Sequence, residues 1–286
     1  MKVSILGSTG FIGSFLRDFL EKNNYEVIPL GRSDLANKEL LKSKLMITDT
    51  LINLAGAPIS KKWTEKYKKV LYSSRIDTTR TLFETLKDLD KRPKSYFSAS
   101  AIGIYDPFYD GIQDEESYKY GDNFLSRLCI DWEKEALRFK ELGIRVVIFR
   151  LGVVLGKGGG AMAKIIPLFK QGVGGKIGSG DQGCPWIHIE DVAHAFLWAM
   201  ENEKATGIYN LCSPDITTNE RFTQTLASLL KRPAVLKIPE FVLKIKFGEG
   251  AIALTAGPKV MPTRLLKEGF EIKYKDLKEA LKNILA

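Results

Sequence analysis

Cysteine is scarce in this chain of 286 residues, and long apolar runs are absent. The three cysteines, Cys129, Cys184 and Cys212, are odd in number and lack Cys-x-x-Cys spacing. This pattern excludes a disulfide framework and predicts a reducing compartment, the cytoplasm. No stretch approaches the roughly 18 apolar residues of a membrane helix, and an apolar strand follows directly after Met1. We therefore expect neither a membrane span nor a signal peptide.

Histidine is scarcer still, which bears on metal binding. The only two histidines are His188 and His194, with Cys184 nearby in the sequence. Their spacings, Cys-x3-His and His-x5-His, match no common zinc site, so we expect no metal.

Acidic residues are in deficit, because 34 of them face 43 basic residues for a net charge of +9. Such an excess can indicate nucleic-acid binding, but no recognition motif accompanies the scattered lysines. We expect instead a basic surface that attracts phosphorylated cofactors and substrates.

Short apolar strands alternate with amphipathic helices over the first two-thirds of the chain. This alternation predicts an α/β fold, a Rossmann-type doubly wound parallel sheet with helices on both faces. The interval between Leu30 and Leu51 is too short for a helix and a further strand, so we expect a truncated or irregular unit there. The predicted strands after the first are Tyr25–Leu30, Leu51–Leu54, Ser95–Ser100 and Arg145–Leu151, and the predicted helices are Phe11–Leu20, Thr64–Leu86 and Asp122–Leu142.

The pattern changes after residue 206, and we divide the chain there. Residues 1–206 are expected to form a nucleotide-binding domain, with part of 152–186 contributing to a cap, and residues 207–286 a small C-terminal α+β cap. The stretch Gly152–Gly183, with a helix at Ala161–Lys170, is either a lid over the substrate or a mobile surface loop. The predicted cap elements are strands at Gly207–Ser213, Pro233–Ile238 and Glu271–Tyr274 and a helix at Thr218–Lys231, capped by Thr218 or Asn219.

Glycine occurs at every third position of the loop after the first strand. Gly7 would allow a tight turn, Gly10 a close approach of the backbone to a pyrophosphate, and Gly13 close packing of helix on strand. The amides that begin the helix would point at the phosphates, whose charge the helix dipole favours. A plain glycine-rich turn is the alternative, but nucleotide binding requires this strand–loop–helix context. The predicted cofactor contacts are Gly7, Thr9, Gly10, Phe11, Ile12 and Gly13.

The residues after the second strand bear on the choice of cofactor. An acidic side chain there binds a ribose hydroxyl of NAD, whereas an arginine pairs with the 2′-phosphate of NADP. The chain has Gly31-Arg32-Ser33 at this point, so we expect Arg32 to hold the phosphate of NADP(H). Asp34 lies close enough to serve NAD(H) instead, which is the weaker alternative.

Four blocks carry a resemblance to a known family: Gly7–Gly13, Asn53–Gly56, Ser98–Tyr105 and Trp186–Ala193. Together they resemble the extended short-chain dehydrogenase/reductases. Further blocks are similar to the YfcH-like epimerase family proteins, and the resemblance covers essentially the whole chain. These blocks are Asn53–Ile59 with Trp63, Ser74–Thr79, Gly121–Leu125 with Trp132 and Glu133, Gly158–Met162, Gly248–Glu249 and Pro262–Phe270.

The resemblance implies an NADP-dependent oxidoreductase or epimerase that acts on a small carbonyl or nucleotide-sugar-like substrate. It also implies cofactor contacts from Leu54, Ala55 and Gly56. A homodimer through the helices Thr64–Leu86 and Asp122–Leu142 rests on the resemblance alone.

The chain departs from this family where chemistry should occur. In active members a serine holds the substrate oxygen, a tyrosine transfers a proton, and a lysine four residues later lowers the pKa of that tyrosine. No Tyr-x-x-x-Lys occurs before Tyr274–Lys278, near the C-terminus. Leucine cannot transfer a proton, and cysteine cannot replace a fixed positive charge. With Glu133 setting the register, Ser100 matches the serine, the tyrosine position falls on Leu125 or Phe124, and the lysine position falls on Cys129 or Leu128.

Two interpretations of this departure remain open. In the first, another side chain near the nicotinamide supplies the acid, and we assign catalysis to Ser100 and Tyr105. In the second, the protein binds NADP(H) without the redox step, as a regulatory or sensor protein. The other candidate acids are Tyr120, Glu133 and His188.

Four more residues have a functional and a structural interpretation. Trp186 and His188 are candidates for substrate binding, although they can equally anchor the segment that returns to the sheet. Asp191 is expected to cap the helix that follows them. Cys129 is expected to be a buried small apolar residue rather than a nucleophile.

Overall fold

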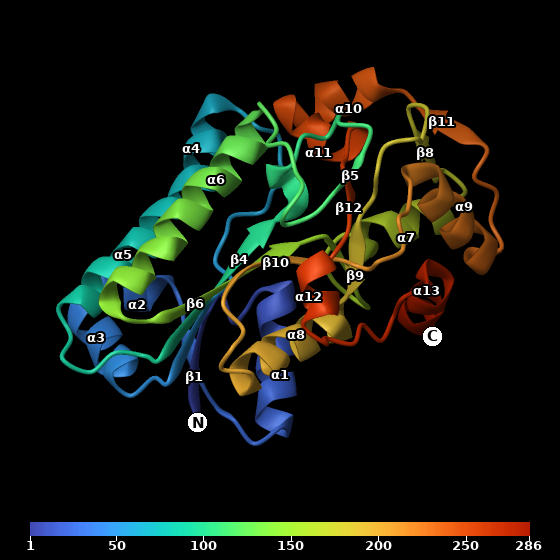
Figure 1. The fold of residues 1–286 in the computed structure, drawn as a ribbon. Coiled ribbons are helices and arrows are strands. Elements are labelled where there is room, and N and C mark those ends of the chain that lie inside the picture. Colours follow the sequence, from blue (N-terminus) through green and yellow to red (C-terminus); the bar gives the residue numbers. More distant parts are fainter.

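The computed structural model describes residues 1–286 and is built on a six-stranded parallel sheet with the order β10-β6-β4-β3-β1-β2 (Figure 1). All five neighbouring pairs of strands run parallel. The predicted Rossmann-type α/β fold is therefore confirmed. The strands are β1 (Lys2–Leu6), β2 (Glu26–Leu30), β3 (Thr50–Asn53), β4 (Ser95–Ala101), β6 (Arg145–Leu151) and β10 (Gly207–Leu211).

Helices cover both faces of this sheet, which explains why its strands are short apolar runs. Helices α1 (Phe11–Lys22) and α8 (Ile189–Glu201) pack together on one face. Helices α3 (Lys38–Met46), α5 (Ile76–Lys87) and α6 (Phe124–Leu137) cover the other (Figure 1). None of the helices combines the length and apolarity that crossing a bilayer requires.

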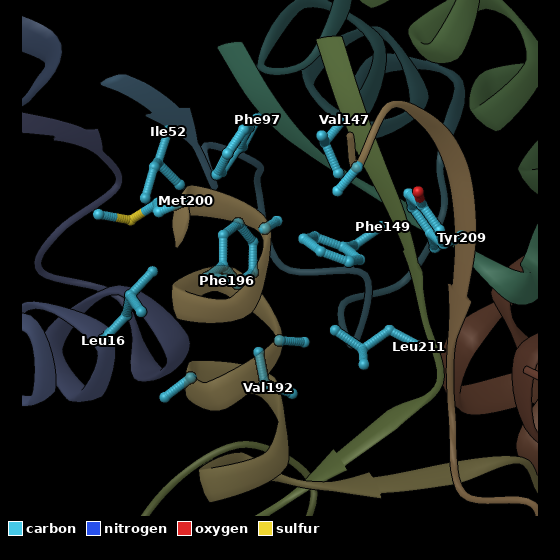
Figure 2. Close-up of a cluster of buried hydrophobic side chains, with 14 of the residues drawn as sticks. Leu16, Ile52, Phe97, Val147, Phe149, Val192, Phe196, Met200, Tyr209 and Leu211 are labelled. Carbon is cyan, nitrogen blue, oxygen red and sulfur yellow. The ribbon is translucent and has the colours of Figure 1, made fainter. Parts of the chain in front are cut away.

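The larger core lies between the sheet and the α1–α8 layer. Figure 2 shows Phe196 of α8 facing Phe97 and Phe149 of the sheet, and Met200 of the same helix belongs to this cluster. Leu16 of α1 closes the same cluster and is fully buried. Burial of these large side chains fixes the two helices on the sheet and so positions the loops that follow its strands.

The predicted irregular unit between the second and third strands is present. Two short helices, α2 (Arg32–Ala36) and α3, fill the interval, and β3 follows without a further strand. Strand β3 pairs directly with β1, so the loops after these two strands are neighbours at the carboxyl edge of the sheet.

The C-terminal part interleaves with the middle of the chain. Two small parallel pairs join them, β8 with β11 and β5 with β12, and a third pair, β7 with β9, forms within the middle part itself. Strand β10 pairs with β6 inside the central sheet, so the strand that we assigned to the cap completes the nucleotide-binding sheet instead. The bounds are β5 (Ile112–Gln113), β7 (Val153–Leu155), β8 (Gly175–Ile177), β9 (Trp186–His188), β11 (Leu236–Ile238), β12 (Lys259–Val260), α4 (Glu65–Ser73), α7 (Met162–Lys170), α9 (Asn219–Leu230), α10 (Glu240–Phe247), α11 (Ile252–Thr255), α12 (Thr263–Lys267) and α13 (Leu277–Leu285).

Three sequence-based boundaries need correction. The helix predicted at Thr64–Leu86 is two helices, α4 and α5, separated at Ser74 and Arg75. The helix predicted at Asp122–Leu142 begins at Phe124 and continues as a 3-10 turn after Leu137. The segment Glu271–Tyr274 is not a strand. The predicted cap of α9 is confirmed, because the Thr218 side chain accepts a hydrogen bond from the Arg221 amide.

Candidate functional site

The glycine loop joins β1 to α1 at the carboxyl edge of the sheet. Gly7 has a φ of 89°, a left-handed conformation that favours glycine. A Cβ on Gly13 would lie 2.1 Å from the carbonyl oxygen of Gly7, so only glycine lets the helix pack this closely on the loop. Gly10 precedes α1 and supplies no side-chain cap, and the first turn of α1 contains no acidic residue. This helix N-terminus is therefore built to receive an anion.

The other residues predicted in this loop divide between exposed and packed positions. Thr9 is exposed at the tip of the loop. The Phe11 ring packs against a second glycine loop, where a Cβ on Gly159 would lie 2.1 Å from it. Ile12 packs against the core between sheet and helices. Phe11 thus ties the predicted lid segment to the start of α1.

The loop after β3 lies against the glycine loop. A Cβ on Gly7 would come within 3.0 Å of the carbonyl carbon of Leu54. The buried Asn53 side chain fixes this second loop by accepting a hydrogen bond from the Ala55 amide at 3.1 Å. Gly56 completes it beside the guanidinium of Arg75. The structure thus brings together the two loops in which the sequence analysis expects cofactor contacts.

Arg32 and Asp34 follow β2 at the same edge and have different surroundings. Arg32 is exposed and begins α2. Asp34 is buried, and its carboxylate accepts hydrogen bonds from the Gly31 amide at 2.7 Å and from Lys44 Nζ at 2.6 Å. Burial alone would raise the pKa of Asp34, but these two bonds hold it below the usual value. The carboxylate is thus engaged within the protein, whereas the Arg32 side chain faces solvent.

Ser100 belongs to a buried polar network at the end of β4. Its hydroxyl donates a hydrogen bond to Glu133 Oε1 at 2.6 Å. Glu133, on α6, forms a two-pronged ion pair with Arg150 on β6, with both contacts at 2.7 Å. Ser100 and Arg150 are paired positions of neighbouring strands, which explains how the sheet assembles this cluster.

Tyr105 lies at the far end of this network. Its hydroxyl accepts a hydrogen bond from Arg150 Nη1 at 2.9 Å and donates one to Asn210 Oδ1 at 2.7 Å. The side chain has no exposed surface, and burial raises its pKa. Ser100 and Tyr105 therefore share one network, but Glu133 and Arg150 lie between them.

Leu125 and Cys129, to which the resemblance assigns the tyrosine and lysine positions with Phe124 and Leu128 as alternatives, lie near the turn after β4. A Cβ on Gly103, in the turn after β4, would lie 2.6 Å from Leu125 Cδ2. Cys129, one helical turn further along α6, is fully enclosed, and burial raises its pKa to about 12. Burial thus favours the uncharged thiol, which agrees with the expected role of Cys129 as a small buried residue.

Tyr120 is a more accessible phenol than Tyr105. It forms a β-bridge with Tyr105, and its side chain remains 41% exposed. The ring of neighbouring Tyr118 lies 4.8 Å from that of Tyr120 and 5.8 Å from the guanidinium of Arg150. Burial, followed by the contact with Tyr118, raises the pKa of Tyr120.

Trp186 and His188 have structural tasks on β9. Trp186 is fully buried and donates a hydrogen bond from Nε1 to Thr217 Oγ1 at 3.2 Å. His188 is buried against the Tyr274 ring, and its Nδ1 accepts a hydrogen bond from the Glu190 amide, which caps α8. A part in substrate binding stays a prediction for both.

We expected Asp191 to cap α8, and this prediction is wrong, because His188 caps the helix. The Asp191 carboxylate is fully buried and accepts hydrogen bonds from the amides of Lys273 and Tyr274, at 2.7 and 3.1 Å. It therefore anchors the C-terminal segment to the sheet domain. No group of three or more His, Cys, Asp or Glu side chains lies together as a metal site requires.

Three residues of the site were missed in the sequence. Arg150 and Asn210 are buried polar side chains inside apolar strands, and such positions are marked in a sequence by a charged or amide residue within a β-branched run. Arg75 gave no signal in the sequence, because the single helix predicted over Thr64–Leu86 would place it on the helix surface.

Comparisons with known proteins agree with this geometry. A family model described as the NAD dependent epimerase/dehydratase family matches residues 3–212, and a domain of unknown function (DUF1731) matches residues 238–284. The mouse epimerase family protein SDR39U1 is 37% identical over all of both chains. The chloroplastic SDR39U1 homolog of Arabidopsis thaliana is 36% identical over 100% of this chain and 87% of its own. The crystal structure of human SDR39U1 with NADPH has a TM-score of 0.91 and 35% identity, and the match covers 99% of each chain.

Proposed function

The chain belongs to the NAD dependent epimerase/dehydratase family, and we propose that it binds NADP(H) along the carboxyl edge of its sheet and exchanges a hydride with a small carbonyl or sugar-like substrate. The observation that carries this proposal is the cradle of Gly7, Gly10 and Gly13, in which the positive φ of Gly7 and the close packing of Gly13 call for glycine. The nicotinamide supplies the hydride chemistry when it is bound.

The surroundings of Arg32 and Asp34 support NADP(H) over NAD(H). Binding of a ribose diol by Asp34 would require its carboxylate to leave Lys44 and the Gly31 amide. Arg32, in contrast, is free to pair with a 2′-phosphate. The NADPH in the crystal structure of human SDR39U1 supports the same choice.

Around the substrate, this chain offers Ser100 and Tyr120. Ser100 is 2% exposed, and to orient a substrate carbonyl oxygen its hydroxyl has to turn its single proton from Glu133 to the substrate. Tyr120 donates the proton, because its phenol is partly exposed and a raised pKa keeps it protonated at neutral pH. Tyr105 has no exposed surface, so it acts at one remove by positioning Arg150.

A second candidate function is a non-catalytic NADP(H) sensor. The observation that favours it is the pair of Leu125 and Cys129, which supply neither a proton donor nor a positive charge at the positions that related enzymes use. A sensor binds the cofactor and shows no turnover with any carbonyl.

Titration with NADPH and NADH, followed by tryptophan fluorescence, tests the cofactor. NADPH is expected to bind more tightly than NADH. Arg32→Ala should weaken NADPH at least about tenfold and leave NADH unchanged, since a charge-assisted hydrogen bond contributes about 1.5–3 kcal/mol. Arg127→Ala, at an exposed position of α6, is the control and should bind like the wild type. Equal affinity for both dinucleotides, with Arg32→Ala silent, contradicts the assignment to NADP(H).

Turnover separates the two candidate functions. The wild type and the Ser100→Ala and Tyr120→Phe variants are assayed with NADPH against a panel of small carbonyls and nucleotide sugars. An enzyme loses most of its rate in both variants while NADPH affinity is kept. Saturable NADPH binding without any turnover supports the sensor.

A further inference from the structure

Arg75 lies in the break between α4 and α5, directly behind the loop that ends in Gly56. A Cβ on Gly56 would lie 2.8 Å from the guanidinium carbon, so glycine at this position allows the charge to approach the loop. The guanidinium donates hydrogen bonds to the carbonyl oxygens of Ala57 and Leu71, both at 3.2 Å, and a longer one to Ser74 Oγ at 3.5 Å. These contacts leave part of its five-donor fork unused.

The guanidinium of Arg75 has no carboxylate partner. Its electrostatic neighbours are the thiol of Cys129, which burial keeps uncharged, and the phenol of Tyr67. Its flat face lies 5.3 Å from the centre of the Trp132 ring, and Trp132 Nε1 is itself buried without an acceptor. Burial lowers the pKa of Arg75, but a guanidinium remains charged in proteins. The surroundings are thus rich in donors and poor in acceptors.

Two other arginines, the buried Arg150 and the half-buried Arg145, show how this protein satisfies such charges when they are structural. Arg150 has the two oxygens of Glu133. Arg145 donates to three carbonyl oxygens around the C-terminal end of α8 and has the Glu203 carboxylate nearby. Arg75 differs from both because no carboxylate lies near it. It lies at the carboxyl edge of the sheet, whereas Arg145 begins β6 at the opposite edge.

Holding two carbonyl oxygens does not require a charge, because a neutral amide side chain donates equally well. A partly buried cation without an anion costs free energy, and an anion that pairs with it recovers part of this cost. The missing component beside Arg75 is therefore an anionic acceptor, and the planar fork of arginine matches the oxygens of a phosphate or carboxylate.

We propose that Arg75 is the oxyanion-binding residue of this site and pairs with a phosphate or carboxylate group of a ligand seated on the Leu54–Gly56 loop. This proposal rests on the proposed function for the place of the ligand. The oxyanion belongs either to the dinucleotide itself or to a second, anionic ligand that binds beside it, and both sources present the same chemistry to the guanidinium.

Three measurements on Arg75→Gln test the proposal: the melting temperature of the ligand-free protein, the affinity for NADPH, and the affinity of the NADPH-saturated protein for inorganic phosphate. The glutamine keeps a donor for the carbonyl oxygens and removes the charge. We expect an unchanged or higher melting temperature and a loss of about tenfold or more in one of the two affinities. Arg75→Lys, which keeps the charge, should lose less affinity than Arg75→Gln. Arg127→Gln is the exposed control.

The pattern of losses identifies the source of the oxyanion. Weaker NADPH binding assigns it to the dinucleotide, and weaker phosphate binding alone assigns it to a second ligand. Unchanged affinities in Arg75→Gln, or a protein that melts several degrees lower or does not fold, show a structural clamp and overturn the proposal. Equal losses in Arg75→Lys and Arg75→Gln also contradict a role for the charge.

The proposed function fails separately from this inference. If the wild type does not bind NADPH, the cofactor assignment is wrong. Phosphate titration of the ligand-free wild type and of Arg75→Gln then still decides whether Arg75 binds an oxyanion.

Discussion

Replacing Arg150 by methionine removes the centre of the buried network that joins β4, β6 and α6. The side chains of Arg150 and Glu133 are 2% and 6% exposed, so water does not reach either charge in the folded protein. Arg150 donates two hydrogen bonds to Glu133 and one to the Tyr105 hydroxyl. Methionine fills a similar length of space but leaves the Glu133 carboxylate buried with Ser100 as its remaining donor.

The expected loss follows from this arrangement. Removing one partner of a buried ion pair costs about 3–5 kcal/mol, because the remaining charge has lost both water and its partner. A chain of this size loses roughly 2 °C of melting temperature for each kcal/mol, so Arg150→Met should melt about 6–10 °C lower. Ser100→Ala should cost only about 1–2 kcal/mol, since Glu133 keeps both contacts with Arg150.

Urea unfolding of Arg150→Met, Glu133→Met and the double variant measures the coupling. In either single variant the remaining charge is buried without a partner, and the second substitution removes that charge. The double variant should therefore lose at least about 1 kcal/mol less stability than the two single variants lose together. Arg127→Met, from an exposed ion pair on the same helix, should stay within about 0.5 kcal/mol of the wild type. A loss below about 1 kcal/mol in Arg150→Met, or losses that add, would refute this account of the network.

Two further predictions concern the cofactor edge. Gly13→Ala places a methyl group 2.1 Å from the Gly7 carbonyl oxygen. The free energy of unfolding in urea should fall by about 1–3 kcal/mol, and NADPH binding should be lost. Binding at wild-type affinity would contradict the close-packed loop. Asp34→Asn should cost about 1 kcal/mol at pH 7, because the carboxylate accepts from Gly31 and Lys44. The pKa of Asp34 is lowered in the folded state, so the difference in stability between the wild type and Asp34→Asn is fully present above the ordinary pKa of 3.8. It disappears as the pH falls through the folded pKa, and a difference that persists in acid would contradict this account.

The sheet could be predicted because each of its strands carries a local signal. Arg145–Leu151 is a β-branched run between polar segments, and the structure gives the strand these same bounds. The short interval after Leu30 excluded a further strand by length alone. These features are decided by residues that are close together in the sequence.

Features that depend on distant partners were not predictable in this way. Gly207–Leu211 is a strand by its own pattern, but its place beside β6 is decided by pairing across the fold. Glu271–Tyr274 has the composition of a strand, yet the buried Asp191 carboxylate takes up the amides of Lys273 and Tyr274 that a ladder would have used. A buried carboxylate can thus replace a neighbouring strand as the acceptor for an extended segment.

The break before α5 is a feature of the site that distant contacts explain and the neighbouring residues do not. Thr64–Leu86 has a helical pattern throughout, and nothing local in it requires an interruption at Ser74 and Arg75. At this interruption Ser74 Oγ accepts a hydrogen bond from the Ala57 amide, and Arg75 donates one to the Ala57 carbonyl oxygen. Both backbone polar groups of Ala57 are therefore bound by the residues between α4 and α5. The loop that lines the predicted cofactor site is therefore positioned by a helix end rather than by its own sequence. The same break places the positive charge of Arg75 beside this loop.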